Sequence, residues 1–435
     1  MSEDSRRNTA AILTLGCKLN IADSEAMARR LRDAGWDVVD RVKEAEAVIV
    51  NTCSVTHVAD QKSRHLVRMA RRIAPNATVA LTGCLLQTAP PEKLDDLAAD
   101  LVYRQPEQST LVDRIIELRG GVPRVVAPAR LAEAVQDAST PVRPAYRTRA
   151  FIAAQEGCND VCAFCIIPRT RGRERSRSVA WVVAEAQKRE AEGVQEIVIT
   201  GTQLGHYGSD VGVRLYDLMK ALLAETSIPR IRMSSVQPQD LDGDLVALWD
   251  DSRLCRHYHL ALQSGSETVL RRMRRRYTQD EYRRAVHRLR QAIPDIAITT
   301  DVIAGFPGET DAEFGECLAF CEEMAFAGIH VFPYSQRSGT VAHKLPGQVA
   351  EHAKKQRVHR IIDLASGMSN AYRRRYLDRT TLVLWEARRD GDLWEGLTDT
   401  YVRVRAGSAA DLTNRITPVR IVALGEDGLM GEVTV

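Results

Sequence analysis

Three apolar runs near the start of the chain each end at a cysteine. They are TAAILTLGC (9–17), EAVIVNTC (46–53) and ATVALTGC (77–84). Continuous runs rich in Val, Ile, Leu and Thr predict buried strands, and the segments 23–34 and 56–73 between them have helical spacing. Alternating strands and helices pair their strands in parallel through right-handed crossovers. The sequence therefore predicts an N-terminal parallel α/β domain.

The same alternation begins again after residue 149. Helical spacing is found at 178–192, 214–226, 240–251, 266–291, 311–326 and, in a Lys- and Arg-rich stretch, at about 349–375. Strands are predicted at 150–154, 195–200, 230–234, 257–262, 296–303 and 328–333. Six such units favour a partial, open (β/α)6 barrel over a closed barrel of eight strands.

The last sixty residues change character. Strand-type residues flank two hairpin signals, Asp390-Gly391 and Asp427-Gly428, which predict a small β-barrel of a class that often binds nucleic acid. Four prolines between residues 121 and 148 predict a linker. The expected domains are 8–120, 144–375 and 376–435.

Composition narrows the class of protein. The chain has 435 residues, of which 44% are hydrophobic and 27% charged, as in a soluble globular protein of about three domains. Its polar start and lack of a long apolar stretch argue against secretion and membrane spanning, so a cytoplasmic protein is expected. Nine cysteines without an export signal indicate metal ligands or reactive thiols and not a disulfide framework.

Arginines are concentrated in three runs, although the net charge is only +3. Each run is compatible with a solvated helix face or loop. Three runs in one nearly neutral chain favour a localised anionic partner, first of all nucleic acid. The runs lie at 169–177, 271–276 and 372–376.

A contiguous cysteine motif, GCNDVCAFCIIP, follows the first strand of the predicted barrel and contains Cys158, Cys162 and Cys165. Three thiolates on one loop can hold three irons of a 4Fe-4S cluster and leave the fourth iron open to a small molecule. Structural zinc normally takes four protein ligands, and only His206 could supply the fourth through folding. The motif favours an iron–sulfur cluster, with zinc as the alternative.

Cys17, Cys53 and Cys84 share the position at the end of a strand. The carboxyl ends of parallel strands meet at one edge of a sheet, so these cysteines are expected to converge. The alternative is three small buried residues, because free cysteine is often interior. Three cysteines at equivalent strand ends favour a second metal site. Core packing is expected for the remaining cysteines, Cys255, Cys317 and Cys321.

The spacing C-x3-C-x-F-C after a barrel strand resembles the signature of the radical S-adenosylmethionine (SAM) superfamily, with Phe164 at the usual aromatic position. The resemblance implies a cluster whose open iron chelates SAM, from which electron transfer releases a 5′-deoxyadenosyl radical. Residues after later strands are expected to contact SAM, although each also suits an ordinary turn. They are Thr200, Gly201, Gln203, Ser234 and Gly305, and Phe164 of the motif is expected to bind the cofactor as well.

Nearly the whole chain resembles the methylthiotransferase family, on the strings LGCKLN (15–20), NTCSVT (51–56), TGC (82–84), GCNDVCAFCIIPRTRGRERSR (157–177) and LQSGSETVLRRM (262–273). The resemblance implies an N-terminal three-cysteine domain, a radical SAM core and a C-terminal TRAM barrel. It places a SAM cluster on Cys158, Cys162 and Cys165, and an auxiliary 4Fe-4S cluster on Cys17, Cys53 and Cys84. The family replaces a C–H bond with C–S–CH3. No catalytic side chain is assigned.

The segment HVFPYSQRSGTVA (330–342) resembles the branch of this family that acts on threonylcarbamoyladenosine. The expected reaction adds a methylthio group to carbon 2 of that nucleoside at position 37 of tRNA. Expected partners are the tRNA anticodon stem-loop, contacted by Arg171, Arg173 and Arg175, and an electron donor such as flavodoxin or ferredoxin. Alternatives are isopentenyladenosine in tRNA, a ribosomal-protein aspartate, or a non-catalytic, zinc-stabilised RNA-binding protein.

Overall fold

The computed structural model describes residues 8–90, 92, 94, 96–104, 107–118, 148–389 and 391–434. These residues form two compact units. The first unit contains residues 8–118 and Ile166–Arg173, and the second contains residues 148–165 and 174–434. The predicted linker lies outside the described residues except for Thr148.

The first unit is built on a five-stranded parallel sheet in the order β2-β1-β3-β4-β5. The central strand β3 is buried at every residue, as its uninterrupted apolar sequence predicts. The parallel α/β arrangement expected from the sequence is confirmed. The strands are β1 (Thr9–Thr14), β2 (Asp37–Val38), β3 (Ala47–Thr52), β4 (Thr78–Gly83) and β5 (Leu101–Val102).

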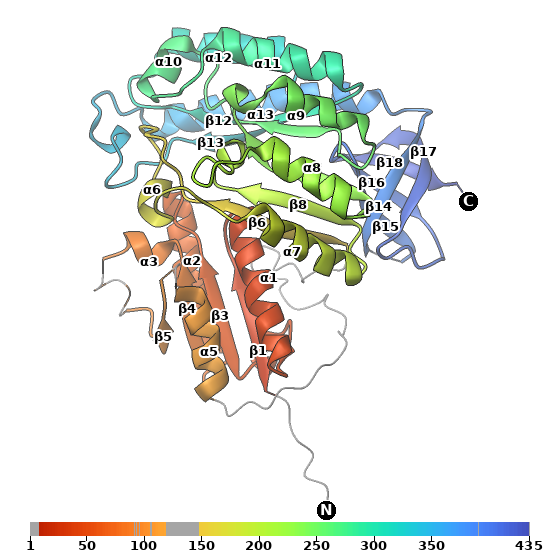
Figure 1. The fold of residues 1–435 in the computed structure, drawn as a ribbon. Coiled ribbons are helices and arrows are strands. Elements are labelled where there is room, and N and C mark those ends of the chain that lie inside the picture. The colour runs from red at the N-terminus through yellow and green to blue at the C-terminus, as the bar shows by residue number, and fades with distance from the viewer. Residues whose placement is uncertain are drawn as a thin grey trace, which may run out of the picture. The chain divides into compact units, whose positions relative to one another are not determined.

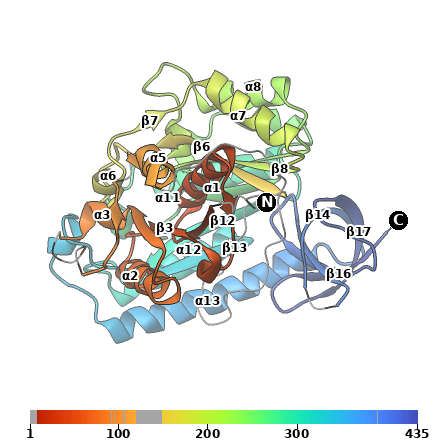
Figure 2. The ribbon, with the colours of Figure 1, turned by 90° about the horizontal axis from the view of Figure 1, so that it is seen from below.

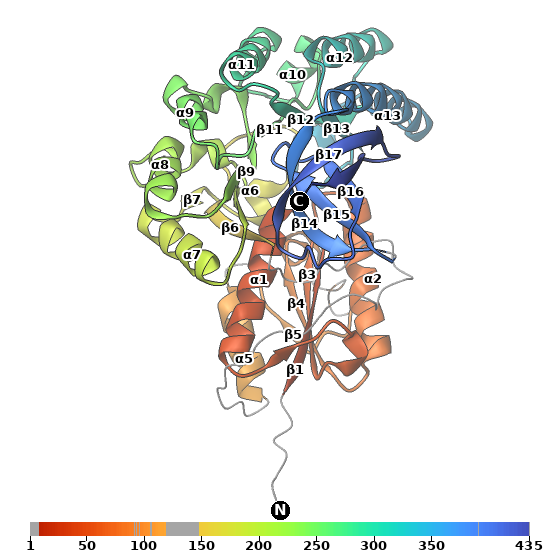
Figure 3. The ribbon, with the colours of Figure 1, turned by 90° about the vertical axis from the view of Figure 1, so that its right-hand side faces the viewer.

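Helices cover both faces of this sheet. On one face Leu31 of α1 packs with Leu111 of α5, and on the other Val67 of α2 packs against the strands. Figure 3 shows α1 and α5 on one side of the strands and α2 on the other. The Thr56 side chain caps α2 by accepting a hydrogen bond from the Ala59 N–H at 3.1 Å. The helices are α1 (Lys18–Asp33), α2 (His57–Ile73), α3 (Leu85–Thr88), α5 (Gln108–Leu118) and α6 (Ile167–Thr170), with a 3-10 turn η1 (Val42–Glu44).

Six parallel strands form the curved sheet of the second unit. With the short strands β7, which is antiparallel to β6, and β10 they make two four-stranded groups, β7-β6-β8-β9 and β10-β11-β12-β13, which a bridge between Ile231 and Leu254 joins. All six predicted barrel strands are present, and β13 is an edge strand. They are β6 (Arg149–Glu156), β8 (Glu196–Gly201), β9 (Arg230–Met233), β11 (His257–Leu260), β12 (Ala297–Ala304) and β13 (Gly328–Pro333), with short β7 (Arg175–Ser176) and β10 (Ser235–Val236).

An outer layer of helices covers this sheet (Figure 1). Their apolar sides form one core with the strands, and this core contains Cys317 and Cys321. Cys255 is also buried, so the expectation of core packing for these three cysteines is confirmed. The helices are α7 (Val179–Ala191), α8 (Leu215–Glu225), α9 (Gly243–Ala247), α10 (Glu267–Arg272), α11 (Gln279–Ala292), α12 (Asp311–Met324) and α13 (Glu351–Arg374), with 3-10 turns η3 (Leu204–His206), η4 (Pro238–Asp240), η5 (Leu248–Asp250) and η6 (Ala342–Lys344).

The prediction of one helix over 266–291 is wrong. Helix α10 ends before Arg274, which has φ +57°, and α11 starts with a capping box between Thr278 and Glu281. Tyr277 between them is buried, and its hydroxyl lies 2.7 Å from the backbone oxygens of Ala261 and Leu262, which share its one hydrogen. The segment 240–251 is likewise a short α9 followed by the turn η5.

The C-terminal residues close into a barrel in the order β14-β15-β16-β18-β17. The hairpin predicted at Asp427-Gly428 is confirmed between β17 and β18, whereas Asp390 of the other signal lies outside the described residues. Helix α13 leads into this barrel (Figure 2). Its strands are β14 (Thr380–Arg388), β15 (Leu393–Thr398), β16 (Arg403–Gly407), β17 (Ile416–Leu424) and β18 (Leu429–Val433).

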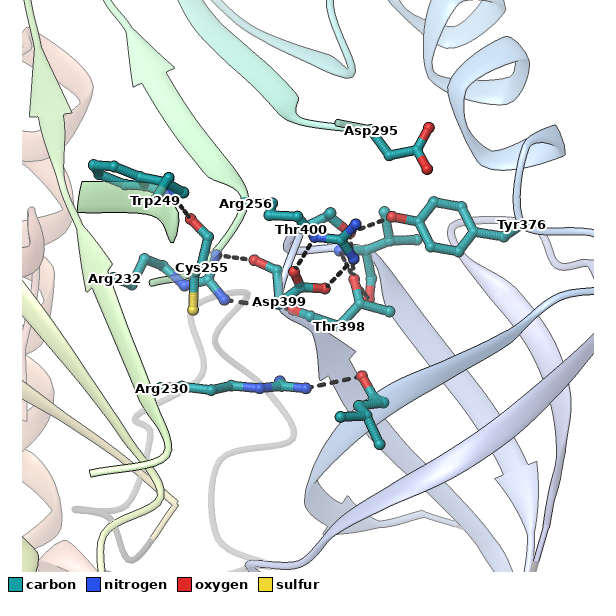
Figure 4. A network of polar contacts seen from close by, with 12 residues as sticks. Arg230, Arg232, Trp249, Cys255, Arg256, Asp295, Tyr376, Thr398, Asp399 and Thr400 are labelled. Carbon is teal, nitrogen blue, oxygen red and sulfur yellow. Dashed lines mark hydrogen bonds and ion pairs between the residues drawn. The ribbon is translucent and has the colours of Figure 1, made fainter. Parts of the chain in front are cut away.

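Three arginines of the α/β sheet bind the C-terminal barrel within the second unit (Figure 4). Arg230 donates to the Leu397 and Leu382 oxygens at 2.9 and 2.8 Å, and Arg232 donates to the Asp399 oxygen at 2.8 Å. Arg256 pairs with the Asp399 carboxylate. These directed contacts hold the barrel against the ends of β9 and β11. No helix among the described residues is both long and apolar enough to cross a membrane.

Candidate functional site

Three cysteines, Cys17, Cys53 and Cys84, follow neighbouring strands of the first unit and are called here the N-terminal triplet. Cys17 precedes α1, Cys53 follows β3, and Cys84 precedes α3. Burial raises the pKa of Cys53 to about 12, and the negative charge of nearby Cys84 and Cys17 thiolates adds to the rise. The sheet therefore brings the three sulfurs into one region at the carboxyl ends of its strands.

A network of polar groups lies next to the N-terminal triplet. The Cys17 thiol donates to Asn20 Oδ1 at 3.4 Å, and Asn20 Nδ2 donates to the Thr52 oxygen at 2.9 Å. Gly83 has φ +99°, and a Cβ added there would lie 2.4 Å from the Thr52 oxygen. Asn20 of LGCKLN and Thr52 of NTCSVT belong to this network. The sequence patterns pointed only to the cysteines of these strings.

Arg171 belongs to the first unit and is only 3% exposed. Its guanidinium donates to Asn20 Oδ1 and Asp23 Oδ2, both at 3.0 Å. Burial raises the pKa of Cys84, and the adjacent Arg171 partly offsets that rise. Of the three arginines predicted to bind RNA, Arg171 thus lies inside the protein, whereas Arg173 and Arg175 are exposed.

Cys158, Cys162 and Cys165, called here the loop triplet, follow β6 in the second unit and are all partly exposed. Cys158 Sγ accepts a hydrogen bond from the Asp160 N–H at 3.4 Å. Burial raises the pKa of Cys158 to about 11, so its thiol needs a cation beside it to ionise at neutral pH. A bound iron would supply that cation, and the three-thiol donor set therefore fits an iron–sulfur cluster.

Backbone hydrogen bonds fix the loop triplet from two sides. The Ala163 N–H donates to the Met273 oxygen at 2.9 Å, and the Ala163 oxygen accepts from the Ala342 N–H at 2.8 Å. Ala163, Met273 and Ala342 belong to a small apolar cluster with Phe306, and Phe164 packs against it. Phe164 therefore anchors the loop on this apolar cluster.

The residues predicted to contact SAM lie at the end of β8 or directly after β8, β9 and β12. The loop triplet follows the carboxyl end of β6. The two sets of residues therefore lie at the carboxyl ends of barrel strands, the side on which barrels of this kind hold their active sites. The Gln203 N–H donates to Gln155 at 2.9 Å, and the buried Ser234 hydroxyl has no hydrogen-bond partner among the described residues. Gly305 has φ +76° beside the side chain of Lys354. Thr200 and Gly201 end β8.

His206 lies near two carboxylates, 3.4 Å from Glu174 and 3.6 Å from Asp240. In the described parts of the chain, no three His, Cys, Asp or Glu side chains gather closely enough to hold a single metal ion. A zinc ion needs ligands that converge on one point, whereas the cysteines of a 4Fe-4S cluster bind irons at separate corners.

Two families match separate parts of the chain. Residues 152–321 match the Radical SAM superfamily, which implies a 4Fe-4S cluster and SAM. Residues 9–103 match the Uncharacterized protein family UPF0004. The first match contains the loop triplet and the second contains the N-terminal triplet.

One solved structure, a radical SAM methyltransferase, TsrM, from Kitasatospora setae, has a similar fold. Its TM-score is 0.54 at 18% sequence identity, covering 75% of this chain and 73% of that one. At this identity the likeness concerns the fold alone.

Curated relatives match nearly the full length. The threonylcarbamoyladenosine tRNA methylthiotransferases MtaB of Bacillus subtilis and of Thermotoga maritima are both 36% identical, over 96% and 97% of this chain and 94% and 96% of their own. A tRNA-2-methylthio-N(6)-dimethylallyladenosine synthase of Caldicellulosiruptor saccharolyticus is 31% identical over 99% of this chain and 93% of its own. The chain belongs to the radical SAM methylthiotransferase family.

Proposed function

We propose that this protein adds a methylthio group to carbon 2 of N6-threonylcarbamoyladenosine at position 37 of tRNA in the cytoplasm. The observation that carries the proposal is the pair of cysteine triplets. Each lies at the carboxyl ends of parallel strands in its own unit. Similarity to threonylcarbamoyladenosine methylthiotransferases over 96% of the chain supports this choice of nucleoside.

The loop triplet is the proposed ligand set of the SAM cluster. With SAM bound, such a cluster supplies an electron that cleaves SAM to a carbon radical. The side chains around it position the cofactor, and Phe164 holds the loop in place. The residues proposed to contact SAM are Thr200, Gly201, Gln203, Ser234 and Gly305.

The N-terminal triplet is the proposed ligand set of the auxiliary cluster. Cys53 and Cys84 are buried, whereas Cys17 is exposed. One side of the site is therefore enclosed and the other is open to a sulfur-carrying reactant. Arg171 places a positive charge near Cys84, which compensates part of the negative charge of bound thiolates.

RNA binding is proposed to involve exposed arginines and the C-terminal barrel. Arg173 and Arg175 are exposed and suited to contact backbone phosphates. A purine in an anticodon loop is unpaired, so moving it into a protein pocket costs little energy. A flavodoxin or ferredoxin is the proposed electron donor, since cluster reduction consumes single electrons.

The test is mass spectrometry of tRNA nucleosides from a strain that lacks this gene. The strain is complemented with the wild type, Cys53→Ala, Cys162→Ala or the control Cys321→Ala, which removes a core cysteine outside both triplets. Methylthiolated threonylcarbamoyladenosine is expected with the wild type and Cys321→Ala. It is expected to be absent with the other two variants.

Other products of the same experiment would replace the proposal. Methylthiolation of isopentenyladenosine alone would favour the second branch, to which the dimethylallyladenosine synthase similarity points. A changed mass of a ribosomal protein without any change in tRNA would favour the aspartate-modifying branch. A colourless, zinc-containing protein that does not cleave SAM would favour a non-catalytic RNA-binding role.

A further inference from the structure

The arginine run at 271–276 lies around the loop triplet, although its composition alone pointed to nucleic acid. Arg275 Nη1 lies 3.2 Å from Cys162 Sγ, across 113 residues of sequence. Arg276 pairs with Asp160 at 3.1 Å. Arg271 and Arg274 of the same run are exposed. Arg275 is thus the member of the run that contacts a cysteine of the loop triplet, whereas Arg276 pairs with Asp160 from an exposed position.

The guanidinium of Arg275 is held in one orientation by three different groups. Its Nη2 donates to Gln237 Oε1 at 2.8 Å, and its Nε donates to the Tyr277 hydroxyl at 3.1 Å. The remaining nitrogen, Nη1, donates to Cys162 Sγ. Because a guanidinium presents its N–H groups in a rigid fork, fixing two of them fixes the third.

The partners of Arg275 are themselves fixed. Gln237 is 5% exposed, and its Nε2 donates to Asp160 Oδ2 at 3.0 Å. The Asp160 N–H in turn donates to Cys158 Sγ. Two sulfurs of the loop triplet, Cys158 and Cys162, are thus linked through three residues: Arg275 and Gln237 by their side chains, and Asp160 by its carboxylate and its backbone N–H. Such a path keeps a charged donor beside Cys162 without help from a substrate.

We propose that Arg275 is a positioning residue that donates a hydrogen bond to the cluster ligand Cys162 and thereby stabilises the reduced form of the SAM cluster. Reduction adds one negative charge to the cluster, and hydrogen bonds to its sulfurs together with nearby positive charge make that addition more favourable. Arg275 raises the reduction potential and eases electron transfer from the donor protein. The inference rests on the loop-triplet cluster and is independent of the tRNA nucleoside.

The experiment is a redox titration of the purified, reconstituted full-length protein, followed by electron paramagnetic resonance. The signal whose shape changes on addition of SAM identifies the SAM cluster. Arg275→Gln removes the charge, Arg275→Lys keeps it with a single donor group, and Arg271→Gln is the control from the same run. Arg275→Gln is expected to make reduction at least tenfold less favourable, a fall of about 59 mV for a one-electron couple. Arg275→Lys is expected to fall less, and Arg271→Gln not at all.

An unchanged potential in Arg275→Gln would overturn the inference. If SAM binding weakens while the potential stays the same, Arg275 holds the SAM carboxylate and not the cluster sulfur. If Arg275→Gln cannot assemble the cluster, the potential of Arg275→Lys decides: a fall relative to Arg271→Gln supports the role, and equality refutes it.

Discussion

Arg256 Nε lies 2.7 Å from Asp399 Oδ2, so a side chain next to β11 forms an ion pair with one from the C-terminal barrel (Figure 4). The backbone oxygen of the same Asp399 accepts from Arg232. One residue of the barrel is thereby bound through both its side chain and its main chain. This arrangement makes the position of the barrel on the sheet dependent on a few specific contacts.

Asp399→Asn is expected to destabilise the second unit by about 1–3 kcal/mol, because the charged partner of Arg256 is lost at a partly buried position. Urea unfolding and limited proteolysis of the barrel measure the effect. Asp392→Asn is the control, since Asp392 pairs with Arg388 on an exposed hairpin. It is expected to change stability by about 0.5 kcal/mol or less. Equal effects of the two variants would contradict a role for Asp399 in docking the barrel.

Glu196→Gln is expected to cost about 3–5 kcal/mol, because Arg232 would be left as an uncompensated buried charge. Glu196 is fully buried and accepts from Arg232 at 2.7 and 3.1 Å. Burial opposes the charge of Glu196, but Arg232 and neighbouring arginines outweigh it and hold its pKa below the ordinary value of 4.5. Its ionised form therefore adds stability above pH 4.5, and this contribution is lost as the pH falls below that value.

This predicted pH dependence is tested by measuring the free energy of unfolding of the wild type and of Glu196→Gln as a function of pH. The difference between the two proteins should be greatest at neutral pH and shrink in acid. Glu192→Gln, which removes an exposed partner of Arg189, is the control. A difference that grows on acidification would contradict the assignment of an ionised Glu196.

Gly305→Ala is expected to destabilise the protein more than Gly172→Ala, although both glycines have φ +76°. The strain of a positive φ is common to both variants and costs about 1 kcal/mol. At Gly172 a new Cβ meets nothing within 4 Å, whereas at Gly305 it would lie 2.5 Å from Lys354 Cγ. Lys354 is buried and paired with Glu351, so overpacking adds about 1–3 kcal/mol. Thermal unfolding compares them, and equal losses would contradict the steric argument.

Removal of one cysteine from either triplet is expected to remove one cluster and leave the other. The wild type should bind about eight irons per chain, and Cys53→Ala or Cys162→Ala about four. Iron and sulfide analysis of anaerobically reconstituted protein measures the content. Cys321→Ala should retain the full amount. Loss of all iron from a single substitution would contradict two independent sites.

The sequence by itself predicted the main strands, their parallel pairing and the position of each cysteine triplet at strand ends. These features depend on local patterns: an apolar run such as Ala47–Thr52 is a buried strand wherever it lies, and the ends of parallel strands share an edge. The loop triplet needed only the spacing of three residues within one motif. Where local patterns were ambiguous, as over 266–291, the prediction of a single helix was wrong.

Only the tertiary structure decided where the arginines point. Arg171 and Arg275 look alike in sequence, each inside a basic run, yet Arg171 is buried beside Cys84 and Arg275 donates to Cys162. Arg173 and Arg271 of the same runs are exposed. A long, flexible side chain takes its direction from partners that the fold brings near, here across more than a hundred residues. No periodicity within a run contains that information, because the partners belong to other elements.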